Sequence, residues 1–154
     1  MRALTIQQPY AHLIMTPQEE LPEGVFHKRV ENRTWDTKVR GTVAIHAGAS
    51  MNMFNNGDYP YRGGKKPKAS DYPEMAFGAI LGMVEIVEVF HLKQIRDADL
   101  PDDYEWLIDN EHTHGPYCFV LKNPQRLRNP IACCGMLGFW TVPEDVVEVM
   151  GTLI

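Results

Sequence analysis

The pattern of hydrophobic and polar positions predicts a chain built mostly from short strands. In residues 42–47 the two β-branched apolar residues alternate with other types, which is the pattern of a half-buried strand. Residues 79–90 are apolar on both faces and predict a central strand. Residues 117–121 and 136–142 predict two further strands. Several short strands with few helices favour a closed or nearly closed β-barrel.

Three helices are expected around these strands. After a short strand at residues 4–6, a helix is predicted over 9–15, because proline suits the first helical position. A second is predicted over about 99–110, where apolar residues have helical spacing. A third is predicted from Thr141, with proline and two acids in its first turn. The expected fold is therefore mainly β with flanking helices (α+β), in one domain spanning 1–154.

The longest irregular stretch covers about residues 51–76 and is rich in glycine, proline and asparagine. Tyrosines alternate there with basic residues, a mixture that suits stacking on bases and contact with phosphates. The other interpretation is a variable insertion with no role. If the stretch binds nucleic acid, the residues expected to do so are Arg62, Lys65, Lys66 and Lys68.

Composition narrows the class of protein. A chain of 154 residues with 44% hydrophobic and 23% charged residues is typical of a globular domain. No apolar run is long enough to span a membrane, and the N-terminus lacks a signal pattern, so a cytoplasmic protein is expected. The three cysteines make no disulfide framework and no Cys-x-x-Cys pair, so no structural zinc site is expected. No other metal site and no cofactor is expected.

Charge is distributed unevenly along the chain. The net charge is −5, yet residues 28–68 hold nine of the 15 basic residues and only three acids, a local net charge of +6. A focused basic face on an acidic body can steer a phosphate-bearing ligand. Chance clustering in a solvated loop is the alternative.

The segment from Lys28 to Trp35 carries the most suggestive chemistry. Glu31 and Arg33 lie two apart and should share one strand face, where they are costly to bury unless they pair or meet a ligand. Glu31 suits the edge of a nucleobase or a general base, and Arg33 suits a phosphate or simply holds Glu31. Lys28 suits a phosphate contact, proton transfer or nucleophilic attack. A solvated edge strand is the plain alternative.

Four other residues are candidates for the same site. Gln8 offers a donor and an acceptor for reading a base. Trp35 suits stacking on a base, although aromatic residues in a small barrel are more often core. His46 is a candidate ligand contact or a structural histidine. Glu85 lies on an apolar strand face, where its pKa should rise unless a cation meets it, and Lys28 is the expected partner.

The order of the motifs resembles that of the ASCH domain family (activating signal cointegrator homology), which has a PUA-like fold. The resemblance covers about residues 2 to 142 and rests on Gln8-Pro9-Tyr10-Ala11, Lys28-x-x-Glu31-x-Arg33, Arg40-Gly41 with His46-Ala47, Gly115-Pro116-Tyr117 and Gly138-Phe139-Trp140. One departure is Phe26, where the family has glycine. The resemblance implies a PUA-like β-barrel and links the chain to RNA and nucleoside handling.

Three functions stay open, the first two implied by this resemblance and the third suggested by the acidic body of the chain. The first is a binding module that takes a nucleobase or nucleotide of RNA, or a modified nucleoside, beside Gln8, Lys28, Glu31 and Arg33. The second is an enzyme on the same ligands, either an acylcytidine amidohydrolase using Lys28 and Glu85 or a ribonuclease. The amidohydrolase branch has threonine where this chain has Glu31, which favours the binding module. The third is a protein-interaction module; the oligomeric state is not predicted.

Overall fold

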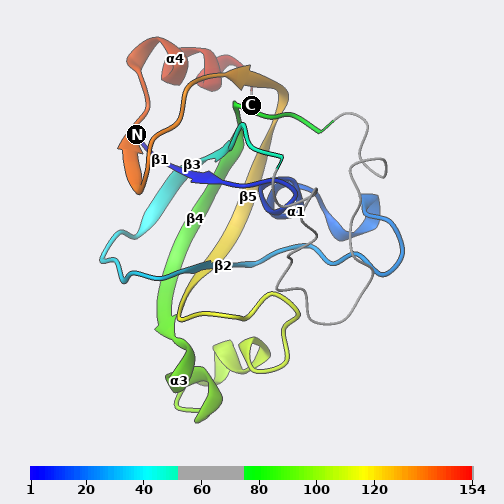
Figure 1. The fold of residues 1–154 in the computed structure, drawn as a ribbon, viewed down its shortest axis with the longest axis vertical. Coiled ribbons are helices and arrows are strands. Elements are labelled where there is room, and N and C mark those ends of the chain that lie inside the picture. Colours follow the sequence, from blue (N-terminus) through cyan, green and yellow to red (C-terminus); the bar gives the residue numbers. More distant parts are fainter. Residues whose placement is uncertain (52–74, 154) are drawn as a thin grey trace.

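The computed structural model describes residues 1–51 and 75–153, whose strands form one six-stranded sheet (Figure 1). The strand order is β2-β5-β4-β3-β1-β6, with β1 parallel to β3 and the other neighbours antiparallel. The sheet curls into a half-barrel, which confirms the expected mainly β fold with flanking helices. The strands are β1 (Arg2–Ile6), β2 (Val30–Arg33), β3 (Gly41–Ala47), β4 (Ala79–His91), β5 (Tyr117–Ala132) and β6 (Phe139–Thr141).

The fifth strand is much longer than its sequence predicts, because it continues through a polar stretch that contains Pro124 and Pro130. The prolines are tolerated because β2 pairs only with residues 117–120, so past that point one edge of β5 needs no ladder hydrogen bonds to the described strands. The β4–β5 pairing also has three register shifts. Such bulges increase local twist and help the sheet to curl.

The helices lie near their predicted positions but are shorter. They are α1 (Tyr10–Met15), α3 (Leu92–Arg96), α4 (Glu144–Leu153) and the 3₁₀ helices η1 (Gln18–Glu20) and η3 (Asp102–Leu107). The helix predicted over 99–110 is thus a 3₁₀ segment, and α3 and η1 are too short to show a helical period in the sequence. The strand predicted over 136–142 is confined to β6, because residues 133–138 form a loop with Gly138 at φ +66°.

The main core lies between the curled sheet and α1. Leu4, Ile6, Val43 and Ile45 of β1 and β3 pack there against α1. A Cβ on Gly82 would clash with the backbone carbonyl oxygen of Gln125 and would lie 2.6 Å from Met15 Cε, so glycine lets β4 lie close to β5 beneath the Met15 side chain. A second cluster holds α4, whose Met150 is buried and whose partly buried valines pack beside it. No helix among residues 1–51 and 75–153 is long and apolar enough to cross a membrane.

Candidate functional site

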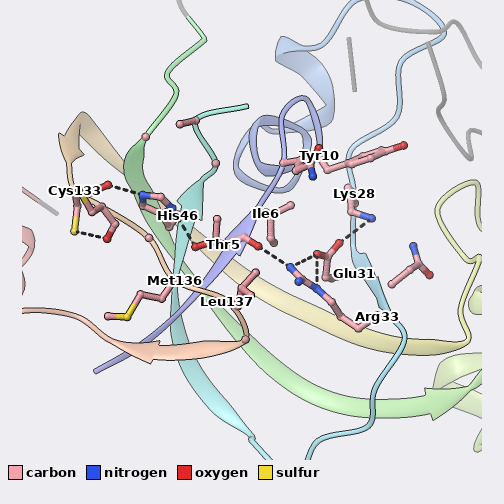
Figure 2. A pocket seen from close by; sticks show the side chains of 18 of the residues that line it. Thr5, Ile6, Tyr10, Lys28, Glu31, Arg33, His46, Cys133, Met136 and Leu137 are labelled. Carbon is pink, nitrogen blue, oxygen red and sulfur yellow. Dashed lines mark hydrogen bonds and ion pairs between the residues drawn. The ribbon is translucent and has the colours of Figure 1, made fainter. Parts of the chain in front are cut away.

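A cleft of about 1180 Å³, as bounded by the described residues, opens beside the end of β1 (Figure 2). Its wall is built from segments far apart in the sequence. One side carries the charged residues of the β2 segment, and the other carries His46 and the loop 133–138, with Thr5 and Ile6 between them. Lys28, Glu31 and Arg33 all line it, so the structure brings three of the predicted site residues together.

Glu31 is the centre of the charged side of the cleft. Its Oε2 lies 2.8 Å from Nη2 and 3.1 Å from Nε of Arg33, and its Oε1 lies 3.5 Å from Nζ of Lys28. Strand alternation places Glu31 and Arg33 on one face, and both cations turn toward the same carboxylate. The three groups carry a net charge of +1 when all are ionised. The arrangement can therefore hold a negatively charged or acceptor-rich ligand.

Lys28 is an ammonium with very little access to water. Its side chain is 2% exposed, its backbone N–H donates to the Leu13 carbonyl of α1, and its Nζ lies 5.0 Å from the centre of the Tyr10 ring. Burial lowers the pKa of Lys28, and the neighbouring Glu31 carboxylate partly opposes that shift. An ammonium has three N–H donors, and one ion pair at 3.5 Å with a ring face does not use them all.

Arg33 is locked to β1 as well as to Glu31. Its Nη2 donates to the Thr5 carbonyl at 2.7 Å, so the guanidinium is fixed in the plane set by two partners. Its side chain is 21% exposed. The Nη1 group donates no hydrogen bond to any residue of the described part of the chain. A rigid guanidinium with a vacant donor edge is suited to a phosphate, a carboxylate or a base carbonyl.

Asn32 shapes the cleft wall, although the sequence analysis did not select it. Its Oδ1 accepts from the backbone N–H groups of His114 and Gly115, at 2.9 and 2.8 Å, and its Nδ2 donates to the His112 carbonyl at 2.8 Å. The side chain thus holds residues 112–115 against β2. The partners are backbone groups some 80 positions away, so the local sequence carries no signal for them.

His112 contributes a neutral imidazole to the cleft wall next to Lys28. Its Nε2 donates to the Phe26 carbonyl at 2.9 Å. Burial and the positive charge of Lys28 lower the pKa of His112 to about 3. The imidazole is therefore neutral at physiological pH and adds no second cation beside Lys28.

His46 lines the cleft as predicted, but both of its ring nitrogens are occupied. Because a carbonyl can only accept, Nε2 donates to the Cys133 carbonyl at 2.6 Å, which leaves Nδ1 to accept from the Thr5 hydroxyl at 3.2 Å. Thr5 Oγ1 in turn accepts from Nε1 of Trp140 at 3.0 Å. These bonds join β1, β3, β6 and the loop, so His46 has a structural role in the wall.

Two predicted ligand contacts lie outside the cleft. The amide of Gln8 is fully buried, donating to the Ala76 carbonyl at 2.7 Å and accepting from the His12 N–H at 2.9 Å. Trp35 packs edge-to-face on Phe119 and Phe139, at 5.4 and 5.6 Å between ring centres. Internal hydrogen bonds therefore take up Gln8, whereas Trp35 is partly buried against the core with the Arg33 guanidinium 6.0 Å from its ring centre. Neither side chain is among the residues that line the cleft.

Glu85 also lies away from the cleft. Its Oε2 accepts from Nδ2 of Asn123 at 2.9 Å, and its strand neighbours are Thr42 and Lys122. Lys28 pairs with Glu31 instead. The expected Lys28–Glu85 pair is therefore not formed. A register shift beside Leu81 puts Leu81 in the main core and Met83 in the second cluster, so the strict alternation on which the pair was based does not hold.

The remaining predicted contacts cannot be placed. Arg62, Lys65, Lys66 and Lys68 lie outside the described residues. Within the described residues, no group of three or more His, Cys, Asp or Glu side chains is arranged to hold a metal ion.

Replacing Asn32 with Ala should lower the free energy of unfolding by about 2–3 kcal/mol, because three hydrogen bonds are lost and two backbone donors are left unpaired. Urea unfolding measures this. Asn129→Ala is the matched control, since Asn129 is exposed and should change stability by less than about 0.5 kcal/mol. Equal losses in the two variants would contradict the role given to Asn32.

Comparison with known proteins identifies relatives of this chain. The ASCH domain profile matches residues 4–130. The human protein Activating signal cointegrator 1 is 30% identical over 149 residues, which are 93% of this chain but 22% of the human protein, so the chain spans about a fifth of that relative's length.

Solved structures of other proteins share the fold of this chain. The crystal structure of ASCH from Zymomonas mobilis superposes with a TM-score of 0.51 at 11% identity, covering 99% of this chain and 94% of that one. A tyrosine-to-phenylalanine mutant of the Zymomonas mobilis protein gives the same TM-score at 10% identity, covering 99% of this chain and 96% of that one. At these identities the likeness supports the fold alone.

Proposed function

This chain belongs to the ASCH domain family, and from that premise we propose that its cleft binds a nucleobase or nucleotide of RNA, or a modified nucleoside, beside Lys28, Glu31 and Arg33. Family membership supports a generic RNA-binding or related function. The choice of ligand and of site rests on the geometry of the cleft.

The observation that carries the proposal is that two cationic side chains with unused donors line the same cleft. Lys28 has N–H donors beyond its long ion pair, and Arg33 has its vacant Nη1 edge. Donors of this kind match phosphate oxygens and base carbonyls. The ligand therefore contributes acceptors, and the protein contributes donors.

In this proposal Glu31 positions the two cations. Both of its carboxylate oxygens already have partners, one in Lys28 and one in Arg33. It holds Lys28 and Arg33 at a fixed separation before the ligand arrives, which reduces the ordering cost of binding. Reading of a base edge by Glu31, expected from the sequence, is a secondary contact here.

Fluorescence anisotropy with a labelled single-stranded RNA tests the proposal. We expect saturable binding. The logarithm of the association constant should fall linearly with the logarithm of salt concentration, with a slope of about −0.7 for each phosphate contacted. A protein-interaction module has no reason to show that slope. Absence of RNA and nucleotide binding at low salt would contradict the proposed function.

Hydrolysis in the same cleft is a second candidate, favoured by one observation. Burial lowers the pKa of Lys28, and an amine with a lowered pKa gives up its proton more readily in a proton transfer. Turnover of an acylated cytidine or of single-stranded RNA, assayed with and without divalent metal, separates this candidate from binding alone. Loss of that turnover in Lys28→Met would support hydrolysis, whereas Glu85→Gln should leave it unchanged because Glu85 lies off the cleft.

A further inference from the structure

The loop between β5 and β6 presents two large apolar side chains at the cleft. Met136 is 62% exposed and Leu137 is 99% exposed, and both line the cleft. Among the described residues, Leu137 is the most exposed large hydrophobic side chain. Two neighbouring exposed apolar residues beside a charged site indicate a contact surface.

The backbone that carries these side chains is fixed. The Cys133 N–H donates to the Gly78 carbonyl at 3.1 Å, and the Cys133 carbonyl accepts from His46 at 2.6 Å. Gly135 packs directly on the wall, because a Cβ there would lie 2.5 Å from Thr5 Oγ1. β6 then begins at Phe139 and pairs with β1. Met136 and Leu137 thus lie between two segments whose backbone is fixed by hydrogen bonds, one at Cys133 and one at Phe139.

The cleft extends beyond its charged side. Its volume of about 1180 Å³ exceeds the ~300–1,000 Å³ of ordinary small-molecule sites. Figure 2 places Lys28, Glu31 and Arg33 on one side of Thr5 and Ile6 and Cys133 on the other, with Met136 and Leu137 below Thr5 and Ile6. The part of the cleft beside Met136 and Leu137 belongs to the same cleft as Lys28 and Arg33.

On the premise of the RNA-binding function above, we propose that Met136 and Leu137 form a wedge that packs against the base next to the one in the cleft, so that the ligand is a single-stranded RNA segment and not a free nucleoside. Leucine and methionine side chains serve as wedges between neighbouring bases in other nucleic-acid complexes. A polynucleotide also supplies phosphates to Lys28 and Arg33 in the same cleft, a charge match that favours RNA over an apolar protein segment.

The test compares two probes, a short labelled single-stranded oligoribonucleotide and a nucleoside monophosphate, on the same variants. Leu137→Ser and the double variant Met136→Ser/Leu137→Ser should bind the oligonucleotide about tenfold more weakly, in the range of a lost base contact, and bind the monophosphate as wild type does. Val149→Ser is the matched control, because it also removes an exposed aliphatic side chain, in α4. Urea midpoints should be unchanged, since Leu137 contributes almost no buried area.

Three results would count against the wedge. Wild-type affinity of the Leu137 variants for the oligonucleotide would overturn the inference, assign the exposed pair to a protein contact and leave the proposed function intact. Equal affinity of wild-type protein for both probes would also overturn the inference and leave the proposed function intact. Failure of both probes to bind wild-type protein would overturn the proposed function and the wedge together.

Discussion

Replacing Glu31 with Gln is expected to lower the free energy of unfolding by about 3 kcal/mol at pH 7, because removing one partner of a buried ion pair leaves the other charge uncompensated. Two cations lose their shared carboxylate in this variant. Lys28 suffers most, since its side chain is 2% exposed and lacks water to replace Glu31. Urea unfolding of wild type and variant measures the difference.

The loss of unfolding free energy caused by Glu31→Gln should become smaller as pH rises. The pKa of Lys28 is lowered from 10.5 in the folded protein, so between that lowered value and 10.5 the unfolded chain binds more protons and stability rises with pH. In wild type the Glu31 carboxylate raises the pKa of Lys28, so its removal lowers that pKa further and extends the pH window at its lower end. The variant therefore regains stability relative to wild type as pH rises past its own, further lowered Lys28 pKa.

Glu88→Gln provides the control for both effects. Glu88 pairs with Arg40 at 3.5 Å, and both side chains are partly exposed. Such a pair is worth less than about 1 kcal/mol, and the variant should follow the wild-type pH profile. A Glu31→Gln deficit that stays constant or grows with pH would contradict the account of Lys28 as a buried, charged partner of Glu31.

Replacing Arg33 with Gln should weaken RNA binding at least tenfold, or about 1.4 kcal/mol. The variant loses the vacant Nη1 donor and also releases Glu31 from its 2.8 Å partner, so the geometry of Lys28 changes as well. Arg33→Lys keeps the charge without the planar fork and should bind with intermediate affinity. Anisotropy titration at fixed salt measures all three proteins.

Arg40→Gln is the matched control for this loss, because it removes the same charge from an exposed position that does not line the cleft. It should bind RNA nearly as wild type does. If Arg33→Gln and Arg40→Gln weaken binding equally, the affinity reflects overall charge, and Arg33 has no specific role.

The sequence was sufficient for the central strand at 79–90 and for the shared face of Glu31 and Arg33, because both depend on local periodicity, but not for the length of β5 or the start of β6. It failed where a side chain's partners are distant. Gln8 has the donor and acceptor expected of a base reader, yet two internal hydrogen bonds occupy them. Glu85 was placed by strict alternation, and the register shifts of β4 and β5 break that alternation. Asn32 was missed because its partners lie about 80 positions away.

A crystal structure of the protein with a bound nucleoside monophosphate tests the central claim most directly. The account predicts that one or more ligand acceptor atoms lie within hydrogen-bond distance of Lys28 Nζ and Arg33 Nη1, with Glu31 still bridging the two cations. A nucleotide bound elsewhere on the protein, with Lys28, Glu31 and Arg33 untouched, would contradict it.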